Sequence, residues 1–443
     1  MIPIRLKDNW SYDGELFDEV RQVLQPFSSV ELKSLTENNP GLLVFPNCLG
    51  NYGDNWEHES LYHFRGETLW AGNVVGFFGV NNIQVQIRSR FDSGDNQYFF
   101  HYMLCRVFGI NMLSWQATTN SESIWDFLPF LFPYFLKRAM RQGLFRTYRT
   151  IYHNDDHIRG TIDISRHICS NIPFNGKVAY RTREYTANNY LISLVRHTIE
   201  VLRRDTRFSC ILNNDVDTRN TVAEIVEITP DYSRNELQKV IAHNLRPVRH
   251  PFYTEYTALQ KLCLQILRHK KITFGNDEKK INGIVFKAEW LWEEYLNTVL
   301  HDLSFNHTVP SRSSTGLYFY EEKGYRGAFP DFYSDRLGII IDAKYKPLGD
   351  RLSSGYLRED RFQLISYVHI QAARAGILLY PTKVNENHGL QWEGILRGYK
   401  LAGNIGGKIG IYGFHIPSDS EDFPTFIHNM LDGECKLKEC DFS

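Results

Sequence analysis

The sequence predicts a multidomain α+β protein with a β-rich domain over residues 1–95, a mainly helical middle region over 96–275, and an α/β domain with a mixed central sheet over 276–443. Three observations support this fold class. A chain of 443 residues suits two or three domains. Apolar residues make up 42% of the chain and aromatic residues 14%, which provides for packed cores and argues against long disorder. The spacing of apolar residues changes from strand-like to helical and then to a mixture of both.

The overall charge argues against a surface that is basic throughout. Lys and Arg number 50 and Asp and Glu 51, so any contact with DNA must be local or must come from a partner. The seven cysteines are scattered and odd in number, which indicates reduced thiols. The N-terminal sequence has no apolar core of a signal peptide, and no stretch approaches the roughly 18 apolar residues of a membrane span. We therefore expect a soluble cytoplasmic protein without a membrane contact.

The clearest element of the first domain is a β-hairpin. The apolar run 74–78 is followed by Asn81 and Asn82 and then by residues 83–88, in which apolar and polar side chains alternate. This alternation is the period of a half-buried strand, and the Asn pair suits a turn.

Helical spacing dominates the middle region, where a less regular stretch over 146–186 interrupts four predicted helices. These helices cover residues 98–108, 124–141, 189–203 and 256–268. In the third domain we predict helices over 288–300 and 360–373 and strands over 328–334, 337–345, 375–380 and 409–414.

Two aspartates and a lysine in the third domain have the spacing of a metal site. Residues 339–341 are three isoleucines, which favour an extended chain. Because side chains two apart on a strand share a face, Asp342 and Lys344 project together. Asp331 follows a proline on the preceding strand, and a turn over 334–336 would fold it back beside them.

Such a convergence is what metal-assisted hydrolysis of a phosphodiester requires. Mg²⁺ prefers oxygen ligands, lowers the pKa of bound water and stabilises charge on the phosphate. Asp331 and Asp342 would bind Mg²⁺, or Mn²⁺ in its place, and the carbonyl of Ala343 would assist. Lys344 would orient or deprotonate the attacking water. A surface hairpin with an ordinary Asp–Lys pair is the alternative, because D-x-K is a common sequence.

The two flanking helices offer further polar groups. Of Glu293 and Glu294, we predict that Glu293 faces the metal or its waters. Gln363 and Tyr367 are four residues apart, so they share a helical face from which they would bind phosphate oxygens or steady Lys344 and the water of the site. For both pairs, a solvated helix surface is the alternative interpretation.

The order of a Glu-bearing helix, Pro-Asp, Asp-x-Lys and Q-x-x-x-Y resembles PD-(D/E)xK nucleases of the RecB-like kind. Upstream, the segments 159–163 and 185–192 are similar to the central part of McrC-type nuclease subunits of McrBC-like, 5-methylcytosine-type restriction systems. Residues 75–87 are similar to the N-terminal β segment of these subunits. The stretch 88–90, Arg-Ser-Arg, departs from the Pro-Lys pair that the family often carries there.

The resemblance implies a Mg²⁺-dependent endonuclease subunit that cuts double-stranded DNA, methylated or not, in antiviral defence. It implies that the domain over 1–95 docks on a McrB-like AAA+ GTPase hexamer and that the chain stimulates GTP hydrolysis there. GTP is expected on the partner only. The segment 403–409 of this chain departs from a P-loop at residues 402 and 409 and suits a glycine-rich hairpin or loop.

Two other functions stay open: a stand-alone PD-(D/E)xK nuclease, and a non-cleaving adaptor that only activates the GTPase. The presence of both aspartates and the lysine argues against the adaptor. A metal role of two further pairs also stays open, since each pair alone is a weak signal. These pairs are His153 with His157 and Cys435 with Cys440.

Overall fold

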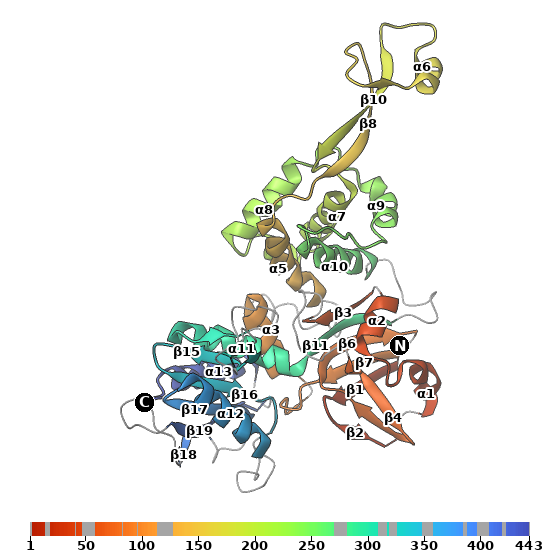
Figure 1. Cartoon of the computed structure of the whole chain (residues 1–443). Coiled ribbons are helices and arrows are strands. Elements are labelled where there is room, and N and C mark those ends of the chain that lie inside the picture. The colour runs from red at the N-terminus through yellow and green to blue at the C-terminus, as the bar shows by residue number, and fades with distance from the viewer. Residues whose placement is uncertain are drawn as a thin grey trace. The chain divides into compact units, whose positions relative to one another are not determined.

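The computed structural model combines helices with mixed sheets, and the α+β class is confirmed (Figure 1). It describes residues 2–13, 18–39, 41–46, 58–81, 83–94, 96–112, 127–269, 281–308, 317–318, 326–347, 358–383, 388–396, 407–418 and 422–442. The chain forms two compact units, one of Met1–Gln116 with Phe274–Ser443 and one of Ala117–Thr273. This division differs from the three predicted domains, because the N-terminal and C-terminal parts of the chain share one unit.

A five-stranded mixed sheet lies at the centre of the N-terminal part of the first unit. Its order is β1 (Ile2–Lys7), β7 (Ile83–Arg88), β6 (Val74–Val80), β11 (Ile281–Lys287) and β3 (Leu42–Phe45). The predicted hairpin is confirmed as the antiparallel pair β6–β7, with Asn81 at a φ of 53° beside the turn. Strand β11 pairs antiparallel with β6 and parallel with β3. A segment predicted to belong to the C-terminal domain therefore completes the N-terminal sheet.

Smaller elements surround this sheet. They are β2 (Ser11–Tyr12), β4 (Tyr62–Arg65), β5 (Thr68–Ala71), α1 (Asp18–Leu24) and α2 (Leu32–Asn38). Side chains of the two helices, including Leu24 and Leu35, join the apolar core that the sheet residues Phe78 and Val85 build. Burial of these apolar side chains is the main stabilisation of this part.

A six-stranded mixed sheet forms the second half of the first unit. Its order is β12 (Asn306–His307), β15 (Phe332–Ser334), β16 (Ile339–Ala343), β17 (Ala375–Thr382), β19 (Lys408–His415) and β18 (Gly389–Ile395). The strand predicted over 328–334 is divided: β14 (Arg326–Ala328) pairs with β13 (Leu317–Tyr318), and β15 begins after Pro330. Proline has no N–H to donate to a ladder, which explains the break. The glycine-rich loop or hairpin was predicted over residues 403–409, of which 403–406 lie outside the described residues.

Helix α12 (Arg358–Gln371) packs on β16 and β17. Leu364 and Val368 join Ile340 and Leu378 in one apolar core. A Cβ on Gly376 would lie 2.5 Å from Cγ2 of Val368, so the close approach of helix and sheet requires glycine at this position. The other helices of the first unit are α3 (Tyr98–Phe108), α11 (Ala288–Leu300) and α13 (Phe423–Lys438).

Polar contacts join the two sheets of the first unit. The ring of Tyr345 is buried, and its hydroxyl lies 2.6 Å from Oγ of Ser89. The guanidinium of Arg90 lies over this ring, 5.1 Å from its centroid, and pairs with the buried carboxylate of Asp8. The segment that follows Lys344 is therefore anchored to the N-terminal sheet.

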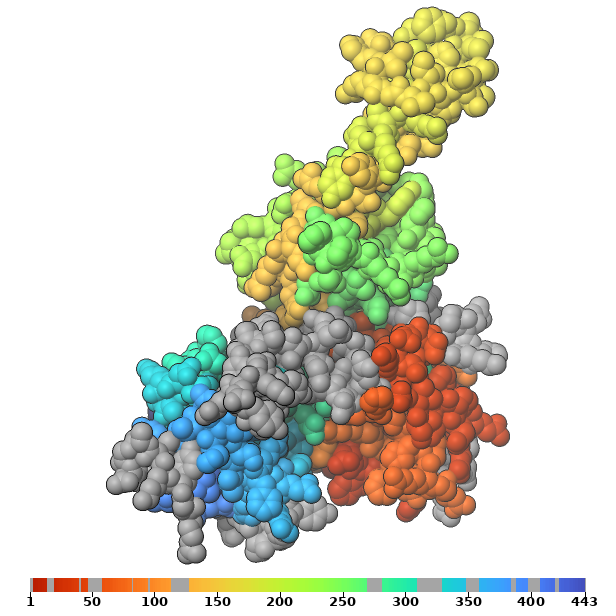
Figure 2. Space-filling view, viewed as in Figure 1, coloured from red at the N-terminus to blue at the C-terminus, as the bar shows by residue number. Residues whose placement is uncertain are grey.

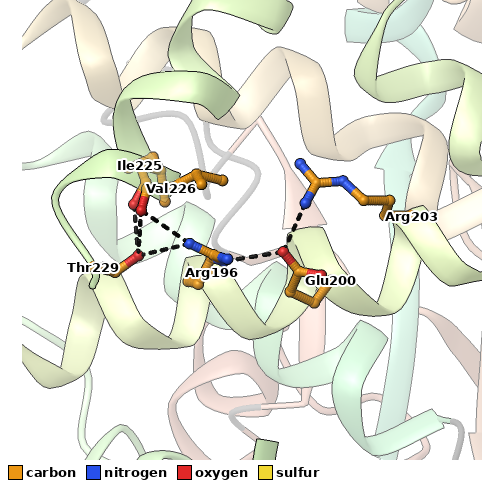
Figure 3. A network of polar contacts seen from close by, with 6 residues as sticks. All are labelled: Arg196, Glu200, Arg203, Ile225, Val226 and Thr229. Carbon is orange, nitrogen blue, oxygen red and sulfur yellow. Dashed lines mark hydrogen bonds and ion pairs between the residues drawn. The ribbon is translucent and has the colours of Figure 1, made fainter. Parts of the chain in front are cut away.

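The second unit consists of a helical bundle and a long β-hairpin. Its helices are α5 (Leu128–Arg141), α6 (Ile164–Asn171), α7 (Tyr190–Arg204), α8 (Val216–Glu227), α9 (Leu237–His243) and α10 (Glu255–His269). Arg196 of α7 connects two helices, because its Nη1 donates to the carbonyl of Val226 at 3.0 Å while its Nε donates to Glu200 at 3.1 Å (Figure 3). The predicted helices over 189–203 and 256–268 are confirmed as α7 and α10.

The hairpin corrects the prediction of an irregular stretch over 146–186. Strands β8 (Thr147–Asp155) and β10 (Val178–Thr186) pair antiparallel over their whole length, and the short β9 (Thr161–Ile162) adds to β10. No residue of β8 is fully buried, so its sequence lacks the apolar alternation of a half-buried strand.

Candidate active site

Strand pairing brings Asp331 beside the segment of Asp342. Phe332 lies opposite Ile341 in the antiparallel pair of β15 and β16. The backbone N–H of Ala343 donates a hydrogen bond to Oδ2 of Asp331, at 2.6 Å. The carbonyl of Asp331 accepts a hydrogen bond from the N–H of Thr308, at 3.0 Å, which holds its backbone from the other side. Both predicted carboxylates thus stand at one end of the same strand pair.

Asp342 and Lys344 form a buried ion pair. Nζ of Lys344 lies 2.6 Å from Oδ2 of Asp342, whose side chain is 2% exposed. Burial raises the pKa of the Asp342 carboxyl, and the Lys344 ammonium offsets part of that rise. Burial lowers the pKa of the Lys344 ammonium, but Asp342 and Asp331 outweigh it and hold this pKa above its ordinary value. The lysine is therefore a cation in this arrangement.

Helix α12 supplies the predicted Gln–Tyr pair. Nζ of Lys344 donates to Oε1 of Gln363 at 3.1 Å, and Nε2 of Gln363 donates to the hydroxyl of Tyr367 at 2.8 Å. Tyr367 is 8% exposed, and burial raises the pKa of its hydroxyl. The amide is thus fixed by the tyrosine and in turn fixes the lysine.

The two glutamates of α11 are both half-buried and stand between Trp292 and Tyr295, which are fully buried. Oε1 of Glu294 lies 3.9 Å from Nδ1 of His307, a residue that pairs with the neighbour of Asp331. This contact connects Glu294, which the sequence prediction passed over, to the strand of Asp331. The inward role of Glu293 and the assistance of the Ala343 carbonyl stay predictions.

The donor atoms fit a magnesium ion held by few protein ligands. In the described ranges, no three His, Cys, Asp or Glu side chains gather closely enough to hold a metal. Mg²⁺ usually needs only one or two carboxylates, because it keeps several waters. Oδ2 of Asp342 is buried and accepts no well-aligned hydrogen bond, although Lys344 lies beside it. A buried carboxylate oxygen that can still accept an interaction suits a divalent cation.

The two weaker metal pairs gain no third ligand among the residues described. His153 lies on β8, where its Nε2 lies 2.9 Å from Oγ1 of Thr182. His157 follows the strand and contacts Asp156, so the two histidines do not share a helical face. Cys435 and Cys440 are free thiols.

Lys346 and Asp360 are two site residues that the sequence prediction missed. Nζ of Lys346 donates to Oδ1 of Asp360 at 3.0 Å, beside the pair formed by Lys344 and Gln363. Two signals could have found them. Lys346 stands two residues beyond Lys344, and Asp360 stands three residues before Gln363 on the predicted helix.

A second candidate surface lies on the hairpin of the other unit. Figure 2 shows this segment in yellow, and its large apolar side chains are solvent-exposed. They are Tyr148, Tyr152, Ile158, Ile162, Ile164, Ile168, Ile172, Phe174 and Tyr185. Several exposed large apolar side chains on one segment are typical of an interaction surface.

One family model matches most of the chain. Residues 69–381 match the family described as "McrBC 5-methylcytosine restriction system component". No curated protein sequence matches the chain. A refined half-complex from a tetradecameric assembly of Thermococcus gammatolerans McrB AAA+ hexamers with bound McrC is similar in structure. The TM-score is 0.51 at 16% identity, over 97% of this chain and 100% of that chain.

The cryo-EM structure of the Thermococcus gammatolerans McrBC complex matches with a TM-score of 0.32 at 17% identity, over 68% of this chain and 87% of that one. Within the described part of the chain, no helix combines the length and the apolar character that crossing a membrane requires.

Proposed function

Since the chain belongs to the McrBC family of restriction-system components, we propose that it is the Mg²⁺-dependent endonuclease subunit of a GTP-dependent restriction system. The observation that carries this proposal is the hydrogen bond from the N–H of Ala343 to Asp331, which holds that carboxylate beside the segment of Asp342 and Lys344. This arrangement supports a site of the PD-(D/E)xK type. The reaction is hydrolysis of a phosphodiester bond in double-stranded DNA.

In the proposed mechanism, Asp331 and Asp342 hold the cation and Lys344 stabilises charge on the reacting phosphate. A bound Mg²⁺ would supply a water of lowered pKa and a positive charge beside the phosphate oxygens. The ammonium of Lys344 contacts Asp342 and Gln363, a position from which Lys344 would also orient the attacking water. Gln363 and Tyr367 hold that ammonium in place, which limits the reorganisation needed during the reaction.

The test is cleavage of methylated and unmethylated plasmid with Mg²⁺, with and without the cognate McrB-like GTPase and GTP. Cleavage that requires partner and GTP supports the restriction subunit. Cleavage by the chain alone supports a stand-alone nuclease. Faster GTP hydrolysis without any cleavage supports a non-cleaving adaptor and contradicts the proposal. Replacing Mg²⁺ with Mn²⁺ tests the alternative metal.

Gln363→Ala is expected to lower the cleavage rate by about 10–100-fold, a cost typical of losing an outer residue that positions a group of a metal site. The amide that holds Nζ of Lys344 would be gone, while the carboxylates would stay. Gln371→Ala is the matched control on the same helix, because its amide contacts Tyr333 instead. Equal rates for the two variants would contradict the role of Gln363.

We also propose that the chain binds a McrB-like AAA+ GTPase hexamer, as its family membership suggests. The predicted docking domain is residues 1–95. The exposed apolar side chains of the hairpin favour a contact on residues 147–186.

Phe174→Asp is expected to weaken stimulation of the partner GTPase by about 10-fold or more, because a charge in an apolar interface costs several times the thermal energy. The Phe174 side chain is 69% exposed, so the fold should tolerate the change. Trp10→Asp tests the predicted domain in parallel, since Trp10 is 57% exposed. A loss of stimulation with Trp10→Asp alone would place the contact on residues 1–95 and contradict the hairpin.

A further inference from the structure

Two lysines leave the end of β16 on the same side and reach the same helix. Lys344 and Lys346 are two residues apart, and the intervening Tyr345 is buried in the opposite direction against Ser89. The ammonium of Lys344 contacts Gln363, and that of Lys346 contacts Asp360. The two acceptors are three residues apart on α12 and therefore share one helical face.

Asp360 is held firmly enough to position a partner. Its side chain is 7% exposed, and Oδ2 accepts a hydrogen bond from the hydroxyl of Tyr380 at 2.9 Å. Tyr380 itself is fully buried on β17, next to β16 in the sheet. A buried carboxylate is costly unless it is paired, so Asp360 needs the ammonium of Lys346 beside it.

The two lysines differ in exposure. The side chain of Lys344 is 16% exposed and that of Lys346 is 53% exposed. Lys346 therefore combines a positioned ammonium with an open approach from solvent, while Lys344 is enclosed among its neighbours. The ammonium of Lys346 therefore suits a ligand that arrives from solvent. Its side chain is already positioned, so it loses little conformational entropy when the ligand binds.

We propose that Lys346 binds a backbone phosphate of the DNA adjacent to the scissile bond, and that Asp360 is the residue that positions it. This inference rests on the proposed nuclease function. Three carboxylates and two ammonium groups lie here, and together they carry a net charge of −1 when all five are ionised. They belong to Asp331, Asp342 and Asp360 and to Lys344 and Lys346. A bound divalent cation changes the charge of these five groups to +1, which favours the approach of a phosphate. A chain of near-zero net charge gains local affinity for DNA in this way.

The test compares Lys346→Gln, Lys346→Arg and Asp360→Asn in the full chain. Lys346→Gln is expected to raise KM for duplex cleavage by about 10-fold with kcat changed far less, because the contact is the same in ground and transition states. The slope of log affinity against log salt should fall by about one, the value for one lost phosphate contact. Lys346→Arg should restore both. Asp360→Asn should raise KM less than Lys346→Gln does.

Binding of a short duplex is measured with Ca²⁺ in place of Mg²⁺ and again with EDTA, so that affinity is read without cleavage. The expected effect of Lys346→Gln appears with Ca²⁺ and is absent with EDTA. Lys436→Gln is the matched control, an exposed lysine paired with Asp432 on α13, and should change neither KM nor slope.

A purely structural ion pair would give a different result. Lys346→Gln and Asp360→Asn would then lower the melting temperature alike, and KM and the salt slope would stay at their wild-type values, which would overturn this inference. The nuclease proposal would survive that outcome if Asp342→Ala abolished cleavage. Cleavage by Asp342→Ala would instead refute the proposed function itself.

Discussion

Asp342→Ala is expected to abolish cleavage, with a rate at least about 1,000-fold lower, because several kcal/mol of metal-borne stabilisation is lost. The side chain is one of two carboxylates proposed to hold Mg²⁺, and it is the counter-ion of Lys344. Raising Mg²⁺ should not restore the rate, since the variant lacks the ligand. The measurement is plasmid cleavage with partner and GTP, with GTP hydrolysis followed in the same mixture.

Asp335→Ala is the matched control, because Asp335 is an exposed carboxylate on the turn between the same two strands. It should cleave at the wild-type rate. The Asp342→Ala protein should still stimulate GTP hydrolysis, since the hairpin proposed to contact the partner is unchanged. Full cleavage by Asp342→Ala would refute the site, and loss of both activities together would point to misfolding.

Glu434→Ala is expected to lower the free energy of unfolding by about 3–5 kcal/mol, the usual cost of removing one partner of a buried ion pair. Glu434 of α13 accepts hydrogen bonds from the hydroxyls of Tyr102 at 2.7 Å and Tyr295 at 3.1 Å. It also pairs with Arg106 at 2.9 Å, and its side chain is 4% exposed. Burial keeps the pKa of both tyrosine hydroxyls high, so they stay neutral donors that would lose their acceptor.

Denaturant unfolding of the full chain measures this loss. Asp432→Ala removes an exposed carboxylate from the same helix, where an ion pair with Lys436 contributes at most about 1 kcal/mol. Replacing Arg106 and Glu434 together by apolar residues should recover part of the loss, because no charge is then left buried. Equal destabilisation by Asp432→Ala and Glu434→Ala would contradict the importance of the buried network.

The local structure of the site was predictable from sequence because apolar residues surround it. Three isoleucines before Asp342 gave an extended segment, and alternation then placed Lys344 on the same side. The helix that carries Gln363 and Tyr367 had its apolar face at Leu364 and Val368. A contact with Lys344 was one of the two roles that these patterns suggested for Gln363, and the hydrogen bond between them is present.

Other features left no such pattern. Glu293 and Glu294 are consecutive and both half-buried, so helical spacing alone cannot choose between them. The hairpin over 147–186 has little buried surface to reveal its period. Lys346 and Asp360 continue the spacing of Lys344 and of Gln363, but no local pattern shows that the two side chains contact each other. The membership of β11 in the N-terminal sheet depends on contacts across about 200 residues, which no local periodicity records.

The position of β11 has a consequence for synthesis on the ribosome. Strands β6 and β3 emerge early, but the strand that lies between them begins only at Ile281. At the usual 5–20 residues per second, roughly 10–40 s pass before that strand is made. During this interval the edges of β6 and β3 that β11 later covers stay open, and open edges readily pair with foreign strands. Nascent chains that stall before Ile281 should therefore be clients of chaperones, and released fragments of that length should aggregate.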